Sequence, residues 1–148
     1  MGRAFEAARA GRPFSMAIAL NYGTMLDVFR RDSAAALVRS REAAALCGKH
    51  QFAYYLAIAQ ILGGWATAME GDPAAGIAQV RLGIDGVKAT GAELRLPFYY
   101  GLLAEAQMAA GMMGEAMANV AGALAYQSRN QEVWAAPTLE RIQRELGT

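Results

Sequence analysis

Three segments of this chain align with one another without gaps at a spacing of 40 residues. They are RDSAAALVRSREAAAL from Arg31, GDPAAGIAQVRLGIDG from Gly71 and GMMGEAMANVAGALAY from Gly111, and the offsets are 71 − 31 = 40 and 111 − 71 = 40. A period of about 20 to 50 residues is typical of repeat proteins, in which each unit buries its apolar face against its neighbours. The chain therefore has to fold as a short array of similar units.

Small residues recur inside these segments at two positions that lie seven residues apart. The first position holds Ala36, Gly76 and Ala116, and the second holds Ala43, Gly83 and Ala123. Seven residues make about two helical turns, so both positions lie on one face of a helix. Two helices approach closely only where the facing side chains are small. This predicts tight helix pairs, and Ala116→Leu should destabilise the protein by more than about 1 kcal/mol through overpacking.

The intervening segments show apolar residues at near-helical spacings, and local signals set the predicted ends. Asp72 followed by Pro73 is typical of a helix start, as is Asp32, whereas Gly91 and Gly111 are typical of residues just past a helix end. Residues 1–11 are predicted to be the end of an earlier helix that stops at Gly11. We predict seven further helices at about 13–30, 33–49, 52–70, 73–90, 97–110, 114–129 and 132–146.

Composition bounds the class of protein. The chain has 148 residues, of which 55% are hydrophobic and 18% charged, and this suits one folded domain spanning 1–148. Lys and Arg number 14 against 13 Asp and Glu, so the basic excess expected of a nucleic-acid binder is missing. The uncharged stretch 52–69 contains Gln60 and two glycines and suits a buried helix better than a membrane span. We expect a cytoplasmic protein without a nucleic-acid or membrane partner.

The repeat pattern resembles tetratricopeptide (TPR) arrays, although the period of 40 is longer than the 34 of those repeats. The resemblance rests on small residues at matching places in the second unit (Gly64, Gly71, Gly76, Gly83) and the third (Ala104, Gly111, Ala116, Ala123). It implies an all-α, right-handed superhelical stack of antiparallel helix pairs, a TPR-like α-solenoid. The implied repeats are 13–50, 52–91 and 97–130, with a capping helix at 132–146.

A closer resemblance covers most of the chain and is carried mainly by the stretch from Leu62 to Gly111. This stretch, with RPFSMAIAL before it and ERIQREL after it, is similar to the C-terminal helical array of large bacterial signalling proteins. In those proteins a nucleotide-cyclase or DNA-binding module is joined to an ATPase module and then to a TPR-like array. The resemblance implies a fragment of such a protein or a stand-alone relative, with a regulatory rather than a catalytic role.

Residues with catalytic or metal-binding chemistry are few. His50 is the only histidine and lies near a predicted helix end, where the helix dipole favours a cation. Cys47 is the only cysteine and is predicted to be buried as a small apolar side chain. Glycines such as Gly63 and Gly83 lack the flanking Lys and Ser/Thr of a phosphate-binding loop and fall inside predicted helices. We therefore predict no catalytic residue, no cofactor and no metal site.

The resemblance places the first helix of each pair on a concave surface that is rich in methionine and aromatic residues. Methionine adapts its shape, so this surface is predicted to bind an apolar helix of a protein or peptide partner, with Asn21 and Glu105 setting its register. Tight closure of the stack or a homodimer would instead bury these residues as core. A sensor that closes around a small apolar or amphipathic ligand is the next alternative, and an enzyme is the third. The predicted groove residues are Asn21, Met25, Phe29, Ile61, Trp65, Met69, Phe98, Glu105 and Met108.

Overall fold

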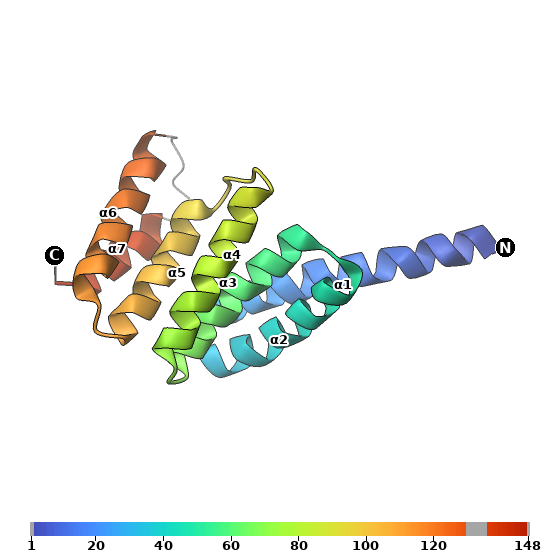
Figure 1. The fold of residues 1–148 in the computed structure, drawn as a ribbon, viewed down its shortest axis with the longest axis horizontal. Coiled ribbons are helices and arrows are strands. Elements are labelled where there is room, and N and C mark those ends of the chain that lie inside the picture. Colours follow the sequence, from blue (N-terminus) through green and yellow to red (C-terminus); the bar gives the residue numbers. More distant parts are fainter. Residues whose placement is uncertain (1, 130–135, 148) are drawn as a thin grey trace.

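The computed structural model describes residues 2–129 and 136–147, with side chains placed for 11–129 and 137–147. All regular structure in these ranges is α-helical, as predicted. Helices that follow one another in sequence pack side by side in an antiparallel manner (Figure 1). The helices are α1 (Gly2–Phe29), α2 (Ser33–His50), α3 (Ala53–Met69), α4 (Pro73–Ala89), α5 (Leu96–Ala109), α6 (Met113–Arg129) and α7 (Ala136–Glu145).

Two aspartates begin the second helices of their pairs. The side chain of Asp32 accepts a hydrogen bond from the backbone N–H of Ala35 at 3.1 Å. Asp72 does the same for Ala75 at 3.2 Å, and Pro73 occupies the first turn that follows. Such a cap satisfies one of the N–H groups that have no partner at a helix start. The predicted starts of α2 and α4 are thereby confirmed.

Residues with positive φ close the turns after the helices. Gly91 and Gly111 each have a φ of 79°, so both are left-handed residues beyond a helix end, as the sequence predicts. Gly71 has a φ of 115° in the turn between α3 and α4, whereas Arg31 adopts 62° in the turn between α1 and α2. A left-handed backbone costs glycine less than other residues, so the same turn is more strained at Arg31 than at Gly71.

The predicted interruption near the N-terminus is wrong. Helix α1 runs without a break from Gly2 to Phe29 and contains both Gly11 and Pro13. Proline removes one backbone hydrogen bond, and glycine costs about 1 kcal/mol relative to alanine inside a helix. Both residues lower the stability of a helix without forbidding its backbone geometry, and here the helix continues through them.

Helix α7 closes the C-terminal end of the stack. Leu139 and Ile142 are fully buried, and both approach α5 at Gly101, where a Cβ atom would lie 3.1 Å from the side chain of Leu139. The predicted capping helix at 132–146 is therefore present from Ala136 to Glu145, and residues 132–135 lie outside the described residues.

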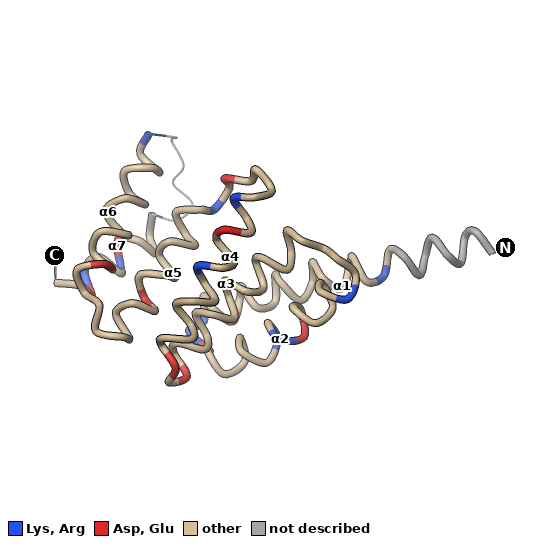
Figure 2. Tube along the Cα trace, viewed as in Figure 1, with Lys and Arg blue, Asp and Glu red and all other residues tan. Residues whose placement is uncertain are grey.

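Helix α3 lies at the centre of the core. It packs against α1, α2, α4 and α5, and Figure 2 shows no charged residue along its length. Trp65 on α3 and Phe98 and Tyr99 on α5 are the largest fully buried side chains. An apolar helix surrounded by four neighbours accounts for the uncharged stretch that the sequence shows at 52–69.

The pair α3/α4 packs backbone against backbone. A Cβ atom at Gly76 would lie 2.5 Å from the carbonyl oxygen of Gly64, and one at Gly83 would lie 2.6 Å from that of Ala57. Backbone atoms cannot swing aside as a flexible side chain does, so only glycine fits at these positions. The small residues at all six positions predicted for tight packing are buried.

Candidate partner-binding surface

The nine residues predicted to line a groove lie mostly inside the stack. Phe29 is 49% exposed, and Met69 and Met108 are partly buried. The other six have exposed fractions of 5% or less, so they correspond to the alternative in which the same side chains form core. These six are Asn21, Met25, Ile61, Trp65, Phe98 and Glu105.

These residues are covered because side chains from the end of α1, from α5 and from α7 meet around Glu105. The rings of Phe29 on α1 and Phe98 on α5 lie 5.4 Å apart, which brings the end of α1 against α5. Arg31, just after α1, reaches Glu105 on α5. Contacts of this kind leave a hollow of only about 80 Å³ next to Glu105.

Glu105 is a buried carboxylate that links α5 to the end of α1, to α3 and to α7. Its Oε2 accepts hydrogen bonds from Arg31 Nη1 at 2.6 Å and from the indole Nε1 of Trp65 at 3.1 Å, while Oε1 accepts one from Arg141 Nη2 at 2.8 Å. The guanidinium of Arg31 also lies 5.2 Å from the centre of the Trp65 ring. A buried carboxylate is stable only when paired and hydrogen-bonded, and both oxygens of Glu105 meet that condition within the chain.

The two arginines were not predicted as partners of Glu105. Arg141 falls in the predicted capping helix, and its guanidinium reaches inward to Glu105 and outward to Glu145, each 2.8 Å away. Burial lowers the pKa of Arg141, and the hydrogen bond and charge of Glu105 and then of Glu145 outweigh this, so the pKa is raised. A single carboxylate in an otherwise apolar helix is the signal that a cation must lie nearby.

Asn21 also makes its contact within the chain. Its Nδ2 donates to the backbone carbonyl of Tyr55 at 3.1 Å and so joins α1 to α3. A hollow of about 130 Å³ lies beside it, where the Arg95 guanidinium stands 5.9 Å from the Tyr22 ring. Burial, followed by the neighbouring Tyr54, raises the pKa of the Tyr99 hydroxyl above its ordinary value of 10.0.

The outer face of α1 is largely apolar, and the Arg39 side chain of α2 covers it at Gly23, where a Cβ atom would lie 2.7 Å from Arg39 Nη1. Met16 is 55% exposed and Leu26 is 51% exposed, and Ala19 lies exposed between them. Arg12 and Arg30 stand at the two ends of this row, and neither forms an ion pair with another side chain that the structure places. We call Arg12, Met16, Ala19, Leu26 and Arg30 the α1 face.

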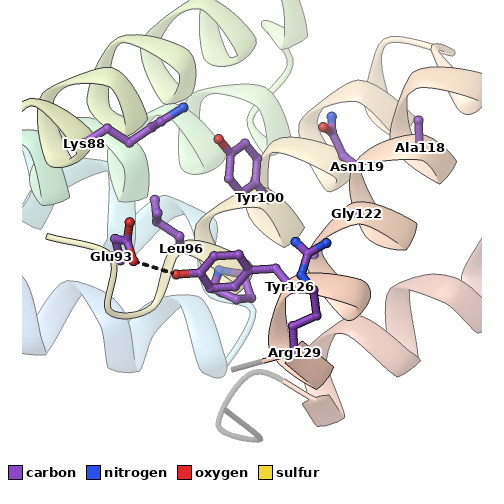
Figure 3. A pocket seen from close by; sticks show the side chains of 11 residues that line it. Lys88, Glu93, Leu96, Tyr100, Ala118, Asn119, Gly122, Tyr126 and Arg129 are labelled. Carbon is purple, nitrogen blue, oxygen red and sulfur yellow. Dashed lines mark hydrogen bonds between the residues drawn. The ribbon is translucent and has the colours of Figure 1, made fainter. Parts of the chain in front are cut away.

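A second exposed surface is the groove between α6 and the turn that joins α4 to α5. It has a volume of about 430 Å³. Figure 3 shows its side chains, among them Tyr100 from α5 and Tyr126 from α6, whose hydroxyl donates to Glu93 at 3.1 Å. Leu96 and Pro97 form a buried apolar base at the start of α5. We call this surface the α4–α6 groove.

The few residues with reactive side chains occupy structural positions. His50 is the last residue of α2, as predicted for a helix end, and its ring stacks on Phe52 with the centroids 5.6 Å apart. Cys47 is fully buried, as predicted, and burial raises the pKa of its thiol. Within the described residues there is no group of three or more His, Cys, Asp or Glu that could hold a metal ion. No helix in the same ranges is long and apolar enough to cross a membrane.

No protein-family model, curated protein or solved structure matches this chain.

Proposed function

We propose that this chain is a non-catalytic protein-interaction module, and that its helix pairs are copies of one TPR-like unit with a period of 40 residues. The second helices of the three pairs support this, because they begin at Ser33, Pro73 and Met113, which are 40 residues apart. Left-handed residues recur at the same interval, at Arg31, Gly71 and Gly111. In this proposal the stack is a right-handed solenoid, and its role in a signalling protein is regulatory.

The observation that carries the proposal is a difference in burial between equivalent positions. Leu26 on α1 is 51% exposed, whereas its counterparts on α3 and α5 have no exposed surface. Ala19 shows the same contrast. On α3 a Cβ at Gly63 would lie 2.8 Å from Ser40 on α2 and 2.9 Å from Gln79 on α4, whereas the neighbour at the equivalent Gly23 on α1 is the partly exposed Arg39 side chain, 2.7 Å away. The counterparts are Ala59 and Ala66 on α3 and Tyr99 and Ala106 on α5.

The α1 face therefore resembles the faces of α3 and α5 that pack against other helices, but no helix in the described residues packs against it beyond the Arg39 side chain at Gly23. In a stack of helix pairs such a face is covered by another helix, because isolated apolar faces gain free energy by burial. We propose that a helix of a partner protein occupies it, with its apolar side on Met16, Ala19 and Leu26.

Charge defines the partner more closely. Arg12 and Arg30 are separated by 18 residues, which is five helical turns and about 27 Å, so both lie on the same side of α1. A partner helix with acidic residues near both ends would meet both arginines. A second copy of α1 in that place would set arginine against arginine, and like charges oppose each other. The proposed partner is thus an amphipathic helix with an apolar centre and acidic ends.

The test uses a synthetic helical peptide with capped termini, leucines along one face and glutamates in its first and last turns. A second peptide carries lysines in place of the glutamates. Fluorescence anisotropy of each labelled peptide is measured against the intact chain. We expect the acidic peptide to bind at least about tenfold more tightly, and the difference to shrink at high salt.

Two variants locate the binding site. Leu26→Glu should weaken binding of the acidic peptide at least about tenfold, because it places a carboxylate in the apolar row. Leu82→Glu is the control, since Leu82 on α4 is 59% exposed and lies outside the α1 face. Equal binding of the two peptides, or equal loss in both variants, would refute the proposal. Dimerisation that Leu26→Glu abolishes would identify a second copy as the occupant and would also refute it.

A further inference from the structure

The α4–α6 groove has the size and lining of a small-molecule site. Its volume of about 430 Å³ falls within the range usual for ligand pockets, about 300 to 1,000 Å³. Leu96 and Ala123 are buried at its base, and the rings of Tyr100 and Tyr126 stand partly exposed along it. Apolar and aromatic surface of this kind binds the flat or aliphatic body of a ligand, and the tyrosine hydroxyls add polar contacts.

The groove is lined by two basic side chains and one acidic side chain. Lys88 and Arg129 contribute two positive charges, and neither forms an ion pair with a side chain in the described ranges. Glu93 is the one acidic residue among the lining residues, and its carboxylate already accepts a hydrogen bond from Tyr126. The first turn of α5, at Leu96 and Pro97, adds the positive end of a helix dipole. The groove therefore favours an anion.

The groove is open along the wall of α6 that is formed by Ala118 and Gly122. Gly122 lines it, and nothing lies within 4 Å of the position that a Cβ atom would take there. Ala118 lines the same wall one turn earlier and is exposed. In Figure 3 the Arg129 side chain extends along this wall toward Gly122 and Tyr126. A side chain at position 122 would therefore begin in open space and extend into the groove.

We propose that the α4–α6 groove binds a small organic anion that has an aromatic body. Lys88 and Arg129 attract its acidic group, and its ring packs on Leu96, Tyr100 and Tyr126. This site lies on other helices than the α1 face, so the two proposals stand or fall separately.

The probe is anilinonaphthalene sulfonate, an aromatic sulfonate, and its neutral analogue phenylnaphthylamine has the same rings without the acid. Binding of each to the intact chain is measured by isothermal titration calorimetry. We expect one sulfonate per chain, bound at least about tenfold more tightly than the neutral analogue. Lys88→Met with Arg129→Met should remove most of this preference while the neutral analogue binds as before. Equal affinity for both probes would overturn the inference.

A pair of leucine variants ties the binding to the groove. Gly122→Leu fills the groove and should abolish saturable sulfonate binding while the chain remains folded by circular dichroism. Gly114→Leu is the matched control, because Gly114 also lies on α6 with nothing within 4 Å of its Cβ position, and it does not line the groove. Sulfonate binding that survives in Gly122→Leu, or is lost equally in both variants, would show that the probe binds elsewhere and would overturn the inference.

Discussion

The helix pairs α3/α4 and α5/α6 share one arrangement but use different residues at their closest approach. In α3/α4 the contact positions are glycines, and carbonyl oxygens lie 2.5 to 2.8 Å from where Cβ atoms would be at Gly64, Gly76 and Gly83. In α5/α6 the corresponding positions hold alanines, of which Ala104 and Ala116 are fully buried. At these positions alanine methyl groups lie between the helices of α5/α6, whereas the backbones of α3/α4 are in direct contact.

This difference changes what else each pair contains. The interface of α5/α6 includes a polar contact, in which Asn119 Nδ2 donates to the side-chain oxygen of the buried Gln107 at 2.6 Å. Helix α5 also carries Glu105, which links the pair to Arg31 and Arg141. The central pair is therefore joined by close backbone packing, and the C-terminal pair adds buried ion pairs and hydrogen bonds to its apolar contacts.

The largest effect is expected from removing both cations around Glu105. Arg31→Met with Arg141→Met leaves a buried carboxylate without a counter-ion, and this should cost about 3 kcal/mol of unfolding free energy. Urea denaturation followed by circular dichroism measures the loss. Glu105→Gln is the control, because it removes the buried charge itself and should cost less than the double variant. If the double variant costs less than Glu105→Gln, charge does not hold the C-terminal pair.

The next effect tests the tight packing of α3/α4. Gly76→Ala places a methyl group against the carbonyl of Gly64, and we expect a loss of about 2 kcal/mol despite the better helix propensity of alanine. The reciprocal change at the equivalent position, Ala116→Gly, should cost about 1 kcal/mol, since it lowers helix propensity and removes one buried methyl group. Thermal unfolding compares the two. Equal costs would mean that the two pairs pack alike.

The same substitution should have the opposite sign on the open side of α6. Gly122→Ala meets no neighbouring atom, so it should stabilise the protein by about 0.5 to 1 kcal/mol through helix propensity alone. The midpoint of urea unfolding is expected to rise. A fall in the midpoint would show that the α4–α6 groove does not accommodate a methyl group at position 122.

The smallest effect concerns Cys47 on α2, which reports whether loosening of one pair spreads to the next. Its pKa is raised by burial above the ordinary value of 9.0, so only the unfolded chain ionises near that pH, and stability should fall as the pH rises beyond it. Iodoacetamide should label the native thiol roughly a thousandfold more slowly than the urea-unfolded one. Gly76→Ala should speed labelling more than Gly122→Ala does. Equal labelling rates would indicate that α2 opens independently.

The sequence by itself determined the features that depend on residues close together in the chain. Asp32 and Asp72 cap the helices that they precede, and Gly91 and Gly111 end the helices before them, because these contacts span only a few residues. The small residues at Gly76 and its equivalents follow from helical periodicity. Gly11 and Pro13 misled the prediction, since a local preference lowers helix stability without deciding it.

Only the tertiary structure decided which faces are covered. Trp65 and Phe98 have the composition of a binding groove, but whether they face a partner or the core depends on how α5 packs on α3 and on whether side chains from the end of α1 and from α7 reach across them. Glu105 meets Arg31 and Arg141 across 74 and 36 residues, and no spacing rule links positions so far apart. The α1 face and the α4–α6 groove likewise exist only where packed helices leave space. Burial is a property of the assembled stack, so it emerges when all the helices are in place.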